Sequence, residues 1–145
     1  MIRLEKVNAD NYQAVLELEL ADSQRGFVAP NVRSLAQAWV FYDRARPYAI
    51  CAGDKVVGFI MFDDKAHERK VEVWRLMIGK EFQGKGYGRE ALSRAIDFLR
   101  AEQKFDFIQI NYVEGNFAAK RLYEKLGFAA TGEMEGNEIV MKLYL

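Results

Sequence analysis

The feature that most constrains the fold is a glycine-rich segment, Gln83-Gly84-Lys85-Gly86-Tyr87-Gly88-Arg89. A predicted strand, Val71 to Ile78, runs into it, and a predicted helix, Arg89 to Arg100, runs out of it. The first amides of a helix have no intrahelical acceptor, and the helix dipole puts partial positive charge at that end. Because the glycines leave this backbone bare, we expect a phosphate group to bind there.

The composition narrows the class of protein. The chain has 145 residues, 50% of them hydrophobic and 29% charged, which predicts one domain covering residues 1–145. Basic and acidic residues balance at 21 each, so nothing predicts a nucleic acid or membrane partner. The single cysteine, Cys51, excludes an intramolecular disulfide. With no signal peptide or apolar run of spanning length, we expect a cytoplasmic protein.

The N-terminal half predicts a strand, two helices and a hairpin. Asp10 is expected to cap the first helix and Ser34 the second, and Pro47 should end any helix before it. The second helix should pack through one apolar face, formed by Leu35, Ala38, Trp39 and Tyr42. The other predicted elements are a strand at Ile2–Val7, a loop at Ala21–Asn31, and strands at Tyr48–Ala52 and Lys55–Phe62 joined by a Gly53-Asp54 turn.

The C-terminal half predicts two more helices. The helix after the glycines has an apolar stripe, Leu92, Ala95, Ile96 and Leu99. The other predicted elements are a polar turn at Asp63–Lys70, a strand at Phe107–Val113, a helix at Asn116–Leu126, and a closing hairpin of Phe128–Glu133 and Glu138–Leu143. The order β-α-α-β-β-β-α-β-α-β-β predicts an α+β fold: a mixed sheet with antiparallel hairpins and at least one crossover.

Two nucleotide-binding motifs fit the glycines poorly. A Walker A loop requires G-x-x-x-x-G-K-[ST], which is absent. In a dinucleotide fingerprint, G-x-G-x-x-G, Gly84 and Gly86 would fit, but Arg89 occupies the third glycine position. Asp106 has the spacing of the ribose-binding acid, yet it precedes the next strand rather than following it. A nucleotide-binding protein is therefore disfavoured.

The pattern Gln-x-x-Gly-x-Gly, formed by Gln83, Gly86 and Gly88, resembles the acetyl-CoA loop of the GCN5-related N-acetyltransferase (GNAT) superfamily. WRLMIG before it (residues 74–79) is similar to that family's pantetheine-binding strand, and NFAAKRLYEKLGF (residues 116–128) to its C-terminal motif. The resemblance implies a mixed, mostly antiparallel sheet of about seven strands flanked by four helices. The whole chain looks most like bacterial spermine/spermidine N-acetyltransferases.

The resemblance implies that acetyl-CoA is the co-substrate. Backbone amides from Gly84 to Arg89 would hold its pyrophosphate, and the backbone near Met77 would supply a donor to the reacting carbonyl oxygen. The residues implied to bind acetyl-CoA are Leu76, Met77, Ile78, Gln83, Gly84, Lys85, Gly86, Tyr87, Gly88, Arg89 and Asn116. No metal-ligand spacing occurs in the chain.

Tyr123 matches the tyrosine that protonates the CoA thiolate in this family. A phenol with a pKa near 10 is protonated at neutral pH and can donate its proton. The alternative is a core aromatic residue. Glu72 is the only acid on the strand before the glycines, so it is our candidate for the base. The alternative is that Glu72 only forms a salt bridge and that a chain of water molecules removes the proton from the amine. His67, in a charged turn, is predicted to be a surface residue, and Cys51, on an apolar strand, is predicted to be a core residue.

The resemblance implies a polyamine acceptor, acetylated directly in a ternary complex, and a homodimer. Glu17, Glu19 and Asp22 are our candidates for binding the polycation, against the alternative of a solvated helix face. Acetylation of a protein N-terminus, a lysine or an aminoglycoside stays open. So does a CoA-binding sensor without turnover, because a fold alone does not choose the function.

Overall fold

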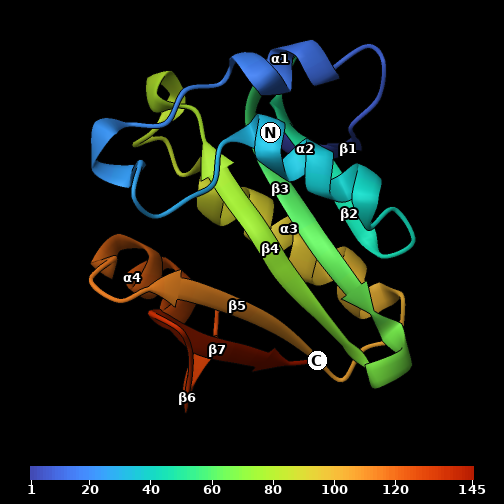
Figure 1. Cartoon of the computed structure of the whole chain (residues 1–145), viewed down its shortest axis with the longest axis vertical. Coiled ribbons are helices and arrows are strands. Elements are labelled where there is room, and N and C mark those ends of the chain that lie inside the picture. Colours follow the sequence, from blue (N-terminus) through green and yellow to red (C-terminus); the bar gives the residue numbers. More distant parts are fainter.

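The computed structural model describes all residues from 1 to 145 and contains one seven-stranded sheet flanked by helices (Figure 1). The predicted order of strands and helices is confirmed. The strands are β1 (Ile2–Lys6), β2 (Ala45–Ala52), β3 (Lys55–Lys65), β4 (Lys70–Ile78), β5 (Phe107–Val113), β6 (Ala129–Glu135) and β7 (Glu138–Tyr144). The helices are α1 (Tyr12–Glu17), α2 (Asn31–Val40), α3 (Tyr87–Ala101) and α4 (Phe117–Lys125), none of them long and apolar enough to cross a membrane.

The strands lie in the order β1-β2-β3-β4-β5-β7-β6, and only the β4–β5 pair is parallel. This pair is short: Lys70–Val73 of β4 is in register with Phe107–Ile110 of β5. Past these residues β4 pairs only with β3, and β5 only with β7. Figure 1 shows the two strands diverging toward their arrowheads. The sheet is therefore split between the C-terminal ends of β4 and β5, the two strands that α3 connects.

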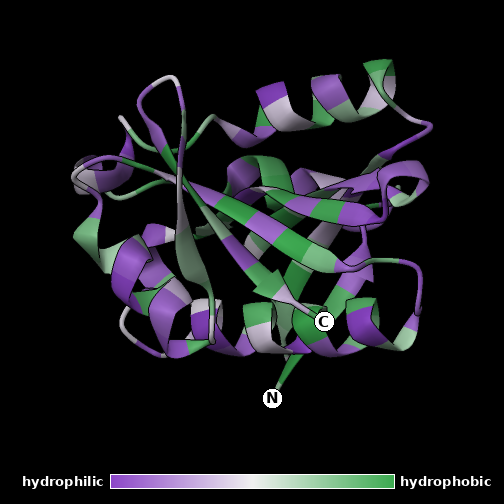
Figure 2. Ribbon diagram, turned by 90° about the horizontal axis from the view of Figure 1, so that it is seen from below, coloured by the Kyte–Doolittle hydropathy of each residue, from purple (hydrophilic) through white to green (hydrophobic).

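Two apolar clusters cover the two faces of the sheet. The larger cluster contains the predicted stripe of α3, all of it buried. The smaller cluster packs Val15 of α1 and Leu35 of α2 against β2, β3 and β4. Figure 2 shows apolar and polar residues alternating along several strands, as expected for a sheet that is packed by helices. Each fully buried leucine or isoleucine contributes roughly 1.5–3 kcal/mol of transfer free energy.

Strand β4 carries a β-bulge at Trp74. Met61 of β3 pairs with Arg75 and Phe62 pairs with Val73, so Trp74 has no partner on β3. An extra residue of this kind bends a strand and shifts the alternation of its side chains. The β4 residues that pack on the larger cluster are accordingly Val71 and Val73 before the bulge, and Leu76 and Ile78 after it.

The two predicted helix caps are wrong. Asp10 does not cap α1: Asn11 is the N-cap, and the side chain of Asn8 accepts the N–H groups of Asp10 and Asn11 at 2.8 and 3.1 Å. Ser34 does not start α2, because the chain becomes helical directly after Pro30. Ser34 is instead buried within the first turn.

The predicted apolar face of α2 is half right. Leu35 and Ala38 pack inward, whereas Trp39 is 77% exposed and Tyr42 is 76% exposed. Trp39 lies about 100° around the helix from Ala38. Tyr42 lies beyond the helix, which ends at Val40, so helical spacing no longer places it. Pro47, predicted to end this helix, lies within β2 instead.

The predicted polar turn Asp63–Lys70 is shorter than expected, because β3 continues to Lys65 and β4 begins at Lys70. Charged residues are tolerated in β3 because they are paired. The carboxylate of Asp63 lies 3.0 Å from Nε of Arg44, and that of Asp64 lies 3.1 Å from a guanidinium nitrogen of Arg46. Helix α3 also begins earlier than predicted, at Tyr87, which brings its first turn into the glycine-rich segment.

Candidate functional site

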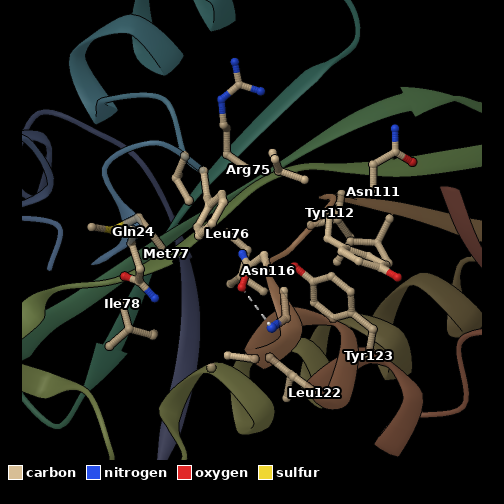
Figure 3. Close-up of a pocket in the computed structure, with 18 of the residues that line it drawn as sticks. Gln24, Arg75, Leu76, Met77, Ile78, Asn111, Tyr112, Asn116, Leu122 and Tyr123 are labelled. Carbon is tan, nitrogen blue, oxygen red and sulfur yellow. Dashed lines mark hydrogen bonds between the residues drawn. The ribbon is translucent and has the colours of Figure 1, made fainter. Parts of the chain in front are cut away.

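A cavity of about 620 Å³ occupies the split between β4 and β5. Its walls come from both strands, from the glycine-rich segment and the start of α3, from α4, and from the loop between α1 and α2 (Figure 3). Glu135 and Glu138 of the closing hairpin complete one side. The split sheet thus brings together segments from most of the chain.

The glycine-rich segment has the open backbone that the predicted anion site requires. Gly84 and Gly86 both have φ +79°, and a Cβ on either would meet no atom within 4 Å. The first helical hydrogen bond of α3 runs from the N–H of Glu90 to the carbonyl of Gly86 at 3.1 Å. The amides of residues 87–89 therefore have no acceptor within the helix. Open space and free donors at a helix N-terminus fit a phosphate group.

Gln83 fixes this segment to its surroundings. Its side-chain nitrogen donates to the carbonyl of Ile78 at 3.0 Å and to the side chain of Gln24 at 2.7 Å. The other predicted residues of the segment that line the cavity are Gly84, Gly86, Tyr87 and Gly88. Lys85 and Arg89 lie outside the cavity lining, so only their backbone or a flexible side chain could reach a ligand.

The end of β4 offers a free backbone edge. Leu76, Met77 and Ile78 line the cavity, and β4 has no strand partner on the β5 side after Val73. An extended molecule can add to such an edge through main-chain hydrogen bonds. Asn116 faces it from the start of α4: its side-chain oxygen accepts the N–H of Ala119 at 3.3 Å (Figure 3), which leaves its NH₂ group free to donate to a ligand.

Tyr123 is both a core residue and a cavity residue. It is only 8% exposed, and its ring packs against Tyr112 and Phe128 with centroid distances of 6.5 and 6.1 Å. Figure 3 shows its hydroxyl pointing into the space between α4 and β4. Burial raises the pKa of Tyr123 well above its ordinary value, because the low-dielectric surroundings disfavour the phenolate. The phenol therefore keeps its proton at neutral pH.

Glu72 lines the other side of the cavity, between β3 and β5. In the sheet register it faces Asp63 of β3 and Gln109 of β5. Burial, helped by the nearby carboxylates of Asp63, Glu135 and Glu138, raises the pKa of Glu72 to about 7, and Lys65 opposes this rise. A carboxylate with such a pKa can gain or lose a proton near neutral pH.

Four functional candidates of this wall were not predicted from the sequence. Gln109 donates to Glu135 at 3.1 Å, and Asn111 donates to Glu135 and Glu138 at 3.1 and 3.2 Å. These amides hold two carboxylates beside Glu72. They were missed because the strand register, which places β5 and the closing hairpin next to β4, is not evident from the sequence. The only signal of this arrangement in the sequence is the alternation of polar residues on these strands.

The three acids predicted to bind the acceptor lie elsewhere. Glu19 pairs with Lys80 at 2.6 Å, and Asp22 pairs with Arg25 at 3.1 Å. Glu17 and Glu19 border a separate cavity of about 200 Å³. None of the three lines the large cavity, to which the loop after α1 contributes only from Gln24 onward.

Arg75 was also not predicted, and it lines the cavity without a carboxylate partner. One guanidinium nitrogen donates to the side chain of Gln37 and another to the carbonyl of Trp74, both at 2.9 Å, while Nε is buried without an acceptor. Burial, together with the charge of Arg33, lowers the pKa of Arg75. Arg75 thus adds one positive charge to the lining of the cavity.

Metal chemistry finds no support in the arrangement of the side chains. No group of three or more His, Cys, Asp or Glu residues is placed to hold a metal ion. His67 is exposed beside Glu68, as expected for a surface residue, and Cys51 is buried, as expected for a core residue.

The family model described as the acetyltransferase (GNAT) family matches residues 12–128. The chain belongs to the GNAT family. Its activity is therefore acetyl-CoA-dependent N-acetyl transfer, with acetyl-CoA as co-substrate. The open space over Gly84 and Gly86 and the free edge of β4 fit this elongated, phosphate-bearing molecule.

Known GNAT relatives point to more than one acceptor. The chain is 28% identical over 151 residues to the spermine/spermidine N(1)-acetyltransferase of Bacillus subtilis (strain 168), covering 97% of both chains. It is 26% identical over 130 residues to the N-acetylaspartate synthetase of Danio rerio, covering 90% of this chain and 42% of that relative. The spermidine N-acetyltransferase of Vibrio cholerae, solved in complex with CoA and spermine, shares the fold with a TM-score of 0.77 at 19% identity, over 99% of this chain and 94% of that one.

Proposed function

We propose that this GNAT acetyltransferase transfers the acetyl group of acetyl-CoA to a primary amine of a polyamine such as spermine or spermidine, directly within a ternary complex. The observation that carries the proposal is the group of three carboxylates, Glu72, Glu135 and Glu138, in the wall of the cavity. Amines with pKa values near 10 are charged at neutral pH, so a polyamine is attracted to such a wall. The relationship to the Bacillus enzyme supports the same acceptor class.

In this proposal the backbone of one half of the cavity holds acetyl-CoA. The amides of residues 84–89 bind its pyrophosphate, with Lys85 and Arg89 at the rim, and the free edge at residues 76–78 pairs with its pantetheine arm. Asn116 donates its free NH₂ group to the same molecule. The amide of Met77 donates to the carbonyl oxygen on which negative charge develops; a donor of this kind is worth about 3 kcal/mol.

The side chains of Glu72 and Tyr123 move the two protons. Glu72 accepts a proton from the acceptor ammonium group, so that the free amine attacks the thioester carbonyl carbon and forms the new C–N bond. Tyr123 then donates its phenolic proton to the sulfur as the C–S bond breaks. The amide nitrogen releases its second proton, which restores the phenol through solvent. The raised pKa of Tyr123 means that the phenol still holds its proton when the thiolate leaves, and the pKa of Glu72 near 7 suits a base.

The experiment is an assay of thiol release from acetyl-CoA with a panel of spermine, spermidine, simple diamines, aminoglycosides, peptides and aspartate. Polyamines should give the highest kcat/KM. Turnover with peptides alone would exclude the polyamine acceptor. Tight CoA binding with no transfer to any amine would instead favour a sensor.

A second acceptor class is favoured by one specific observation. Arg75 is a half-buried positive group in the cavity wall without a carboxylate partner, and its Nε is buried with no acceptor. An acceptor that carries both an amine and a carboxylate would pair with it, and one relative is named for such a product, N-acetylaspartate. Aspartate turnover that is abolished by Arg75→Gln, with poor polyamine turnover in the wild type, would establish this acceptor instead.

A further inference from the structure

Glu72 sits in a cross-strand arrangement that would be unfavourable by itself. It is the register partner of Asp63 across the antiparallel pair β3–β4, so the two carboxylates lie on the same face of the sheet. Like charges placed directly opposite each other destabilise such a pair. Asp63 is also buried, which removes the solvent that would otherwise screen the repulsion.

Lys65 lies between these two carboxylates. It stands two residues after Asp63 on β3, so its side chain is on the same face. Its Nζ atom lies 3.8 Å from Oδ2 of Asp63 and 3.9 Å from Oε2 of Glu72. The other oxygen of Asp63 contacts Arg44 at 3.0 Å. Arg44 therefore compensates Asp63, and the charge of Lys65 remains for Glu72.

The other charged groups around Glu72 do not replace Lys65. Glu135 and Glu138, on the closing hairpin, are negative and oppose ionisation of Glu72. Arg75, further along β4, is bound to Gln37 and to its own strand, on the side of α2. From β5, the register partner of Glu72 is the neutral Gln109. Lys65 is the only cation within 4 Å of the Glu72 carboxylate.

We propose that Lys65 is a positioning residue, which holds Glu72 in its ionised form at the edge of the cavity, ready to accept a proton from the acceptor. The proposal rests on the role of Glu72 as the base in the proposed function. Without Lys65, the half-buried carboxylate of Glu72 would face that of Asp63 with no cation of its own, which favours protonation of Glu72. Asp63 would still have the guanidinium of Arg44 at 3.0 Å, and a protonated Glu72 carboxyl accepts no proton.

The test is the pH dependence of kcat/KM for the wild type and for Lys65→Met. The acid limb should move to higher pH in the variant. A shift of about one pH unit lowers the ionised fraction of Glu72 at pH 7 from about one half to about one tenth, which is a loss of about fivefold in kcat/KM. At about pH 9.5 the two enzymes should converge, and Lys65→Arg should restore the wild-type profile.

Lys70→Met is the matched control. Lys70 is the register partner of Lys65 at the same hairpin and its side chain is 27% exposed, against 26% for Lys65, but its nearest carboxylate is that of Glu68, at 3.7 Å. It should leave the acid limb in place. An equal loss of kcat/KM at every pH in Lys65→Met would overturn the proposal, because it would mean that Lys65 only supports the fold.

A measurement without acceptor separates this proposal from the proposed function. The carboxyl carbon of Glu72 can be titrated by NMR in the CoA-bound protein, with Lys65→Gln as a second variant in case Lys65→Met does not fold. A higher midpoint in the variant supports the role of Lys65 even if no polyamine is acetylated. An unchanged midpoint overturns it even if polyamines are good substrates.

Discussion

The two halves of the cavity are built in different ways. The half assigned to acetyl-CoA uses backbone groups: the free amides of residues 87–89 and the unpaired edge of β4 after Val73. The half assigned to the acceptor uses side chains from β4, β5 and the closing hairpin, and amides of Gln109 and Asn111 hold two of its carboxylates. Backbone sites depend on chain geometry, whereas side-chain sites depend on residue identity.

This difference indicates where the specificity of the protein can change. Substitutions on the acceptor wall leave the backbone of the other half intact, so the acceptor can vary while acetyl-CoA is retained. Tyr123 belongs to neither half alone, because it is packed in the core between them and its hydroxyl faces the cavity. Variants of the three regions should therefore change different kinetic constants.

The largest effect is expected for Tyr123→Phe. Loss of a general acid lowers kcat by about 10²–10⁴-fold. The dissociation constant of CoA, measured by calorimetry, should stay within about twofold, since the ring and its packing remain. Tyr112→Phe, which removes a hydroxyl from the neighbouring ring, is the control and should keep most of the activity. If Tyr123→Phe turns over at the wild-type rate, Tyr123 is only a core aromatic residue.

The acceptor half is tested by the double variant Glu135→Gln/Glu138→Gln. Hydrogen bonds to charged groups contribute about 1.5–3 kcal/mol each, so the loss of two should raise KM for spermine by about 100-fold or more. KM for acetyl-CoA should not change. Glu133→Gln alters an exposed acid of the same hairpin that pairs with Lys142, and it should leave both constants unchanged. A rise in KM for acetyl-CoA would show that the two halves are not independent.

The acetyl-CoA half is tested by Gly86→Ala. A side chain at positive φ costs about 1–2 kcal/mol, and here the new methyl group would point into open space near the phosphate site. KM for acetyl-CoA should rise about 5- to 10-fold. Gly53→Ala in the β2–β3 turn is the matched control, because Gly53 also has positive φ and open surroundings. It should lower stability similarly without changing KM; equal KM values for both variants would argue against the phosphate site.

The smallest expected effect is on stability, at Glu72. The pKa of Glu72 is about 7 in the folded protein, against 4.5 for an exposed glutamate, so the folded state binds an extra proton between these pH values. The free energy of unfolding should therefore fall as the pH rises from about 4.5 to about 7. Glu72→Gln should remove on the order of 1 kcal/mol of this fall, measured by urea denaturation across the pH range. An unchanged pH dependence would mean that Glu72 is solvated.

Much of the fold and the acetyl-CoA half could be predicted because their causes are local in the sequence. The glycines themselves allow the positive φ angles of their segment, and the spacing of the apolar residues in α3 determines which face of the helix is buried. The caps were less predictable: the side chains of Asn8 and Asn11 accept the N–H groups of residues 8, 10 and 11 before α1, and Pro30 starts α2 before Ser34. Strand β3 extends beyond its apolar residues because ion pairs stabilise Asp63 and Asp64 within the strand, although charged residues in such a run predict a turn.

The acceptor half could not be predicted because its causes are not local. Glu72 meets Gln109 only through the register of the single parallel pair, and Glu135 and Glu138 join them only because β7 pairs with β5. The acids near α1 attracted the prediction because they are close together in sequence. In space Glu19 pairs with Lys80 and Asp22 pairs with Arg25 instead.

The bulge at Trp74 divides β4 into two parts in which side chains of opposite numbering, odd or even, face the same side of the sheet. Before it, odd-numbered side chains face the larger cluster; after it, even-numbered ones do. Deletion of Trp74 would restore a regular alternation in which Leu76 and Ile78 still face α3, whereas loss of a residue elsewhere in β4 would turn one part of the strand over. The unpaired residue thus absorbs the difference in phase between the part of β4 that carries Glu72 and the part that forms the acetyl-CoA edge, and length changes away from Trp74 should be tolerated far less than substitutions.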